Sequence, residues 1–121
     1  MSQAKDNPLA QKSYSFALDI IFLCKILMNE KREYILSKQL LRSGTSIGAN
    51  IAEANGAISS ADFSAKISIA YKESLETKYW LSLLKDAEYI NLEEFDKLHP
   101  LADELSRIMF SILKSTRMKK N

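Results

Sequence analysis

Apolar side chains recur at helical spacing along almost the whole of this 121-residue chain. The chain contains only three glycines and two prolines, so few residues can interrupt an element. Residues three and four apart share one face of a helix, and four stretches of the sequence show this repeat. No stretch shows the alternation that is typical of a half-buried strand. The sequence therefore predicts an all-α fold.

The four predicted helices are joined by short polar connections, and they span about 8–28, 31–57, 60–88 and 92–115. Amphipathic helices with such short connections favour an up-down-up-down four-helix bundle in a single domain, residues 1–121. Pro100 is expected to kink or break the fourth helix, because its ring clashes with the carbonyl four residues back. Residues 116–121 are expected to form a frayed basic tail after that helix.

Capping residues support three of the helix starts. Asn7, followed by proline, is typical of an N-cap. Ser59 or Ser60 is expected to cap the third helix, and Asn91 the fourth, where Glu94 completes a capping box.

The first two helices carry strong apolar patterns. In the first, Leu18, Phe22 and Ile26 lie opposite the main apolar face, so this helix is expected to be buried nearly all round. In the second, one narrow stripe continues to the end of the helix and is formed by Leu36, Leu40, Ile47, Ile51, Ala54 and Ile58.

Small residues recur every four positions in the second helix, at Gly44, Gly48, Ala52 and Gly56. The spacing is helical, and the stretch lacks the lysine and the preceding strand of a phosphate-binding loop. Each interior glycine costs about 1 kcal/mol relative to alanine, so the helix needs a compensating contact. Close packing against another helix, in the same subunit or the next, is the favoured interpretation. A local kink and a ligand site remain alternatives.

The third helix carries a second set of apolar residues, Ile69, Trp80 and Leu83, opposite its core face. Contiguous exposed apolar surface is typical of an interface, and tryptophan is a favoured anchor. These residues predict a homo-oligomer, with scattered exposed residues as the plain alternative.

Cations gather in two places. Lys31, Lys38 and Arg42 are predicted to share the outer face of the second helix, with Arg32 near its start. The tail adds Arg117, Lys119 and Lys120. Such side chains contact phosphate without reading sequence, and several subunits would multiply the patch. A solvated face is the alternative.

Nothing in the sequence predicts catalysis, a cofactor or a metal. Cys24 and His99 fall on different helices, and a di-iron bundle needs Glu-x-x-His motifs that the chain lacks. Glu73 and Glu76 are expected to be solvated or to pair with neighbouring subunits. A lone cysteine suits a reducing compartment, and no apolar run is long enough to span a membrane, so we expect a cytoplasmic protein without a membrane partner.

Two blocks of sequence carry a resemblance. "SKQLLRSGTSIGANIAEA" and "DFSAKISIAYKESLETKYWLSLL" resemble the four-helix-bundle family of the 23S rRNA intervening sequences, which is similar to the accessory variability determinant proteins of diversity-generating retroelements. The resemblance implies a pentameric ring and no established activity. It matches Arg42, Gly44, Gly48, Asn50 and Glu53 in the second helix, and Glu73, Glu76 and Trp80 in the third, without a catalytic role for any.

Together these features predict a non-enzymatic, ring-shaped homo-oligomer that binds RNA, or a nucleic-acid-binding protein, through its basic patches. A protein scaffold or adaptor that binds no nucleic acid is the alternative.

Overall fold

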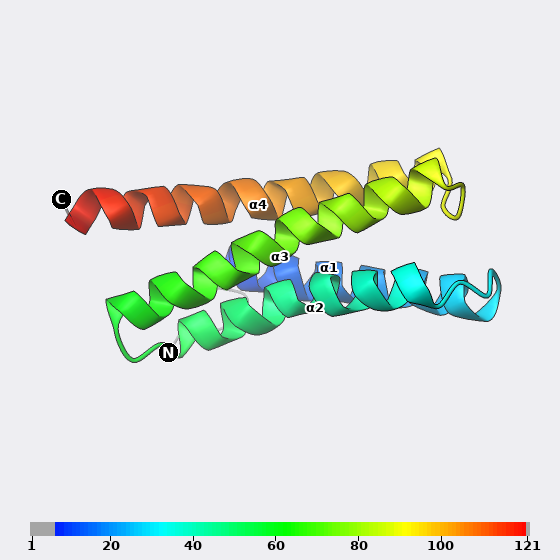
Figure 1. The fold of residues 1–121 in the computed structure, drawn as a ribbon. Helices are drawn as coiled ribbons and strands as arrows, with labels where there is room; N and C mark the ends of the chain where they lie inside the picture. The colour runs from blue at the N-terminus through cyan, green and yellow to red at the C-terminus, as the bar shows by residue number, and fades with distance from the viewer. Residues whose placement is uncertain (1–6, 121) are drawn as a thin grey trace.

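The computed structural model describes the backbone of residues 7–120 and the side chains of residues 7–116. It contains four helices, α1 (Pro8–Asn29), α2 (Ile35–Asn55), α3 (Ser60–Asp86) and α4 (Leu92–Lys120). Successive helices run in opposite directions, so the fold is an all-α, up-down-up-down arrangement (Figure 1). Each helix packs along the next one in sequence, whereas α1 and α4 meet over a shorter stretch and α1 does not touch α3.

The helix starts follow the capping residues. The side chain of Asn7 accepts a hydrogen bond from the backbone N–H three residues on, and Pro8 is the first helical residue. Ser59 caps α3 in the same way. Asn91 and Glu94 form a reciprocal capping box, with N···O distances of 2.8 and 2.9 Å.

The start of α2 differs from the prediction. The helix begins at Ile35, four residues later than expected, because Arg32 has a left-handed backbone (φ 57°) that no α-helix accommodates. The side chain of Glu33 then reaches forward and accepts hydrogen bonds from the backbone N–H groups of Ile35, Leu36 and Ser37 at 3.2, 3.0 and 2.7 Å. A carboxylate thus satisfies three N–H groups that a helix start leaves without partners.

The other helix ends also shift. α2 ends at Asn55, so Ile58 leaves the predicted stripe and is 94% exposed in the following loop. α4 runs on through Pro100 without a break, and its backbone stays helical to Lys120 beyond the predicted start of the tail.

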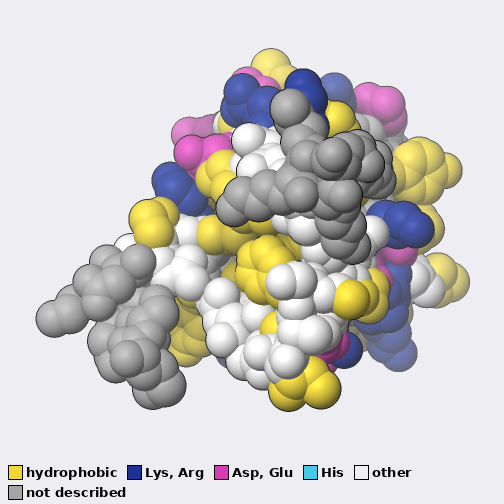
Figure 2. Space-filling model, turned by 90° about the vertical axis from the view of Figure 1, so that its left-hand side faces the viewer, with side chains coloured by type: hydrophobic (Ala, Val, Ile, Leu, Met, Phe, Trp, Pro, Cys, Tyr) yellow, Lys and Arg dark blue, Asp and Glu magenta, His cyan; other side chains and the backbone are white. Residues whose placement is uncertain are grey.

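The core lies between all four helices, and its largest fully buried side chains are aliphatic with one phenylalanine: Phe16, Ile20, Leu27, Leu40, Ile47, Ile51, Ile67, Leu81, Leu84, Leu105 and Met109. Seen from the end at which α4 finishes, apolar side chains also show at the centre of the surface (Figure 2). The C-terminal turns of α4 extend past the start of α1, which leaves that part of α4 less covered (Figure 1).

Two pairs of hydroxyl groups lie inside this apolar core. Thr77 Oγ1 lies 2.9 Å from Ser43 Oγ and joins α3 to α2. Ser74 Oγ lies 2.7 Å from Ser106 Oγ and joins α3 to α4. All four residues are buried, and each hydroxyl also contacts a carbonyl of its own helix, so the core holds these polar groups without leaving them unsatisfied.

The expectation that α1 is buried nearly all round is wrong for the single chain. Leu18, Phe22 and Ile26 are exposed, and Tyr14 continues their line toward the start of the helix. Only α2 and α4 pack along α1, and they cover just the face that carries Phe16 and Ile20. An apolar pattern all round a helix requires cover on every side, and here one side lacks it.

Candidate functional site

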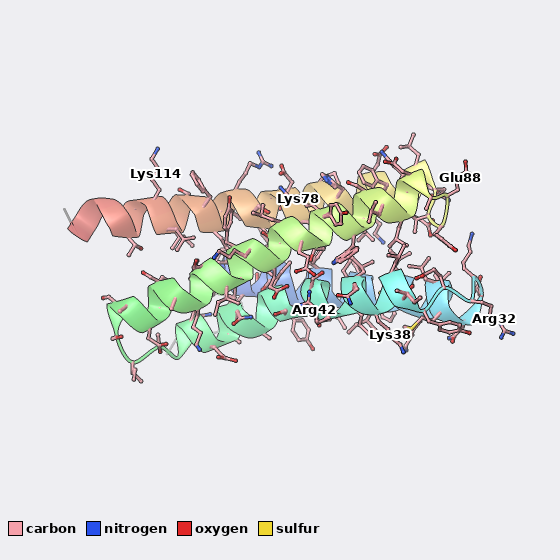
Figure 3. The ribbon with its side chains drawn as sticks, in the orientation of Figure 1. Arg32, Lys38, Arg42, Lys78, Glu88 and Lys114 are labelled. Carbon is pink, nitrogen blue, oxygen red and sulfur yellow. The ribbon has the colours of Figure 1, made fainter. Side chains whose placement is uncertain are left out.

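A polar cluster joins α2 and α3 through residues of both sequence blocks. The guanidinium of Arg42 donates to Glu73 at 3.2 Å and also pairs with Glu76. The indole N–H of Trp80 donates to the same Glu76 carboxylate at 2.9 Å. Arg42 lies near the middle of α2, on the side that faces α3 (Figure 3). Both glutamates therefore pair within their own chain, where the sequence favoured solvent or a neighbouring subunit.

The cluster also sets the charge of its members. The hydrogen bond from Trp80 and the contact with Arg42 hold the pKa of the Glu76 carboxyl below its usual range. Arg42 is opposed by two carboxylates, so it presents less free positive charge than a lone arginine. Glu53, the remaining glutamate of the sequence blocks, pairs with Lys66 of α3 at 3.3 Å.

Three of the predicted nucleic-acid contacts form a basic corner, which we define as Lys31, Arg32 and Lys38. All three are exposed, and among the side chains that the structure describes they form no ion pair. Lys31 and Arg32 lie in the loop before α2 and not on the helix, so the shared helical face predicted for Lys31, Lys38 and Arg42 is wrong.

The basic tail is separate from this corner. The side chains of Arg117, Lys119 and Lys120 lie outside the described part of the structure. The backbone that carries them ends α4 at the opposite end of the bundle from Arg32, as the positions of Arg32 and Lys114 show (Figure 3). Within one chain, the backbone of the tail and the basic corner therefore lie at opposite ends of the bundle.

The small residues of α2 turn gradually away from α1. A Cβ atom at Gly44 would lie 2.9 Å from Ile20 Cγ2, so glycine is required for this approach of α1 and α2. At Gly48 a Cβ atom would lie 3.4 Å from the backbone oxygen of Ser13, an ordinary contact. Gly56 follows the end of α2, where a Cβ atom would lie 3.7 Å from the backbone oxygen of Glu53, an ordinary contact.

Beyond Gly44 the two helices separate into a shallow groove of about 360 Å³. Its walls are short side chains except at one edge, where Tyr14 stands over it, and it is lined by Ala10, Ser13, Tyr14, Ala17, Thr45, Gly48, Ala49 and Ala52. The exposed Ala52 belongs to this groove rather than to the contact between the helices.

The predicted second face of α3 is only partly as expected. Ile69 is exposed, but Trp80 and Leu83 are half-buried, and Trp80 packs against the core while its indole bonds Glu76. The other large apolar side chains of α3 that are exposed are Leu75 and Tyr79, which the sequence interpretation missed.

The lone thiol and the lone imidazole lie apart. Cys24 is buried and its thiol donates to the carbonyl of Ser37 at 3.4 Å; burial, with the nearby Glu33 carboxylate, raises its pKa to about 12. His99 stacks on Phe95 with ring centroids 4.7 Å apart, and burial with the nearby lysines lowers its pKa. The described residues contain no group of three His, Cys, Asp or Glu side chains arranged to hold a metal, and no described helix is long and apolar enough to cross a membrane.

The model of the 23S rRNA-intervening sequence protein family matches residues 5–111. The chain belongs to this family. The fold is also similar to the crystal structure of a protein with unknown function from the S23 ribosomal protein family of Bacteroides thetaiotaomicron VPI-5482, with a TM-score of 0.86 and 49% sequence identity. That similarity covers 88% of this chain and 98% of the other. None of the curated proteins compared with the chain matches it.

Proposed function

We propose that this family member acts as a ring-shaped homo-oligomer, which binds RNA and catalyses no reaction. Five copies per ring is the number that the family resemblance favours. The observation that carries the proposal is a pair of apolar faces on helices that do not touch, one on α1 and one on α3.

The α1 face is a stripe formed by Tyr14, Leu18, Phe22 and Ile26, four residues apart. Successive members drift by about 40°, so the stripe crosses the helix obliquely. It runs from the groove beside α2, which Tyr14 borders, to a pocket beside α4 that Phe22 and Ile26 line. The stripe extends over about 18 Å of the helix.

The exposed area of this stripe fits an interface. Tyr14 is 70% exposed and Phe22 is 56% exposed, so these two aromatic side chains together present roughly 250 Å². Leu18 and Ile26 extend the stripe to roughly 400 Å², which is within the range of functional patches and about half of one side of a standard interface.

The α3 face is centred on Leu75 and Tyr79, which lie four residues apart, while Ile69 lies about 120° around the helix from Leu75; all three side chains are exposed. Since α1 and α3 are diagonal in the bundle, the two faces point away from each other. Docking the α1 face of one copy on the α3 face of the next leaves one free face at each end, and repetition of such a heterologous contact gives a ring when the rotation between copies closes.

Assembly would also strengthen RNA binding. A single basic corner makes few phosphate contacts, and binding by so few cations is weak and sensitive to salt. A ring repeats the corner once per copy, so one RNA molecule can bind several corners, and the later contacts are intramolecular.

The assembly is tested with one variant for each face. Light scattering should give several times 13.7 kDa for the unchanged protein. Tyr14→Ser/Phe22→Ser and Leu75→Ser/Tyr79→Ser should each give monomers with unchanged helix content, because these side chains are exposed. Ile58→Ser, at a still more exposed loop position, should leave the assembly intact.

Mixing the two monomeric variants separates a heterologous contact from a symmetric one. Each variant retains the face that the other has lost, so an equimolar mixture should form a heterodimer of twice 13.7 kDa. Symmetric pairing of two α1 faces predicts instead that the α3 variant remains a dimer by itself. Unchanged protein that is monomeric at 100 µM would refute the assembly proposal.

RNA binding is tested by mobility shift with a structured RNA at 50 and 200 mM salt. Binding should weaken steeply with salt and in the variant Lys31→Ala/Arg32→Ala/Lys38→Ala. Retention by that variant of full affinity, or absence of binding by the unchanged protein at 50 mM salt, would contradict the RNA proposal and favour a protein scaffold.

A further inference from the structure

Two large apolar side chains stand exposed within the basic corner. Tyr34 is 45% exposed and Ile35 is 77% exposed, at the junction between the loop and α2. A single exposed apolar residue is ordinary, but here an aromatic ring and an aliphatic side chain are adjacent and have cations on both sides in the sequence. Aromatic rings among cations are the usual composition of surfaces that bind single-stranded nucleic acid.

The backbone places the ring and a cation on one face. The N–H of Lys38 donates to the carbonyl of Tyr34 at 3.3 Å, which is the hydrogen bond of a first helical turn. Residues four apart on a helix lie on the same side, so the ammonium of Lys38 extends from the side of the corner that carries the Tyr34 ring. Arg32 lies at the same end of the bundle and points away from it (Figure 3).

The corner is also held rigidly. Glu33 lies between Arg32 and Tyr34, and the residue as a whole is 9% exposed. It accepts three backbone N–H bonds and a fourth from the hydroxyl of Ser37 at 2.8 Å. The neighbouring Arg32 adopts the left-handed backbone conformation that only a well-fixed loop maintains in a residue with a side chain.

This arrangement also decides which groups a ligand can meet. The carboxylate of Glu33 uses the free N–H groups at the start of α2, so those groups are not available to a phosphate. Because it points inward, the carboxylate presents little negative charge to the corner. A ligand therefore meets the ring of Tyr34, the side chain of Ile35 and the three cations, with the exposed carboxylate of Glu30 next to Lys31.

We propose that this corner binds single-stranded RNA, with an unpaired base stacked on the ring of Tyr34 and against Ile35, and with the flanking phosphates beside Lys31, Arg32 and Lys38. The inference rests on the RNA binding proposed above and specifies the form of RNA that is bound. A base in a duplex is stacked on its neighbours and cannot reach the ring, whereas a base in a loop or single strand can. The corner should therefore prefer unpaired segments.

The test compares Tyr34→Leu with Tyr34→Phe, using fluorescence anisotropy of a labelled 15-nucleotide RNA, the same RNA as a duplex, and the matching DNA strand. Leucine removes the π-face and phenylalanine keeps it, and neither change touches a capping bond, because the Tyr34 side chain makes none. Tyr34→Leu should weaken single-strand binding at least about five-fold, as the loss of one stacked base predicts. Tyr34→Phe, and Ile58→Ser in the distant loop after α2, should leave the affinity for single-stranded RNA within two-fold of that of the unchanged protein.

Four outcomes would overturn the inference, and they differ in what they imply for the proposed function. If Tyr34→Leu binds the single strand as well as the unchanged protein does, stacking is excluded while RNA binding stands. The same conclusion follows if Tyr34→Leu weakens duplex and single-strand binding equally. Tighter binding of the DNA strand than of the RNA would overturn the assignment to RNA. No binding of either RNA by the unchanged protein would remove both the inference and the RNA part of the proposed function.

Discussion

Replacing Gly44 by alanine should destabilise the bundle, although the same change at Gly48 should stabilise it. Alanine is favoured over glycine inside a helix by about 1 kcal/mol, and both substitutions lie inside α2, so each gains this helix propensity. At Gly44 the new methyl group would lie 2.9 and 3.0 Å from the two γ-carbons of Ile20, a side chain with no exposed surface. Overpacking of this kind costs about 1–3 kcal/mol, so the net effect is a loss of about 0–2 kcal/mol.

At Gly48 the added methyl group would meet the backbone and hydroxyl of Ser13 no closer than 3.4 Å. The improved helix propensity is then not offset by a clash, so Gly48→Ala should raise the free energy of unfolding by up to about 1 kcal/mol. Gly44→Ala should therefore be less stable than Gly48→Ala by about 1–3 kcal/mol, because only the methyl group at position 44 clashes with α1.

The assay is thermal unfolding followed by circular dichroism at a fixed protein concentration, because assembly makes the midpoint depend on concentration. A difference of about 1 kcal/mol should move the midpoint by about 4 °C. An Ile20→Ala background supplies the control, since it removes the clashing carbons and should convert the Gly44→Ala penalty into a gain. A Gly44→Ala protein as stable as Gly48→Ala would refute the argument.

Three further predictions concern ionisable groups. Glu33→Ala should lower the free energy of unfolding by about 1–2 kcal/mol at pH 7. Burial disfavours the charged form of Glu33, but the hydrogen bonds from Leu36 and Ser37 lower its pKa overall. In urea unfolding at a series of pH values, the loss should therefore persist above the unfolded pKa of about 4.3 and disappear as the pH falls through the lower folded pKa. Arg42→Ala should lower the free energy of unfolding by about 1 kcal/mol at pH 7, measured by the same urea unfolding. The variant and the unchanged protein should differ less once acid protonates Glu76, and an equal difference in stability at pH 7 and at low pH would contradict the ion pair. Cys24 should resist a thiol-specific disulfide reagent at pH 8 until the protein unfolds, because a pKa of about 12 leaves almost no thiolate; fast labelling of folded protein would show that the thiol is not buried as described.

The sequence predicts local features of this fold well. The caps at Asn7, Ser59 and Asn91 depend on residues three apart, and such short-range contacts are visible in the sequence. The start of α2 was missed because it depends on Glu33, which appears in the sequence only as one more charge in a polar break. A glutamate followed by a serine four residues later was the available signal.

The surfaces were harder to predict, because periodicity shows which residues are apolar but not what covers them. The stripe that includes Phe22 was assigned to the interior for this reason. Trp80 was assigned to an outer face, but its indole nitrogen finds a partner in Glu76 and its ring covers part of the core. Arg42 was grouped with free cations because its carboxylate partners lie 31 and 34 residues away in the sequence.

The buried hydroxyl pairs give α3 a fixed position along its neighbours. Ser74 and Thr77 lie three residues apart on α3 and bond to different helices, so an axial slip of α3 breaks at least one pair and leaves hydroxyls unsatisfied in an apolar core. No such pair joins α1 to another helix in the described part of the structure. The slowest amide exchange is therefore expected in α3, while α1 is the helix that can adjust its position when its outer surface is covered.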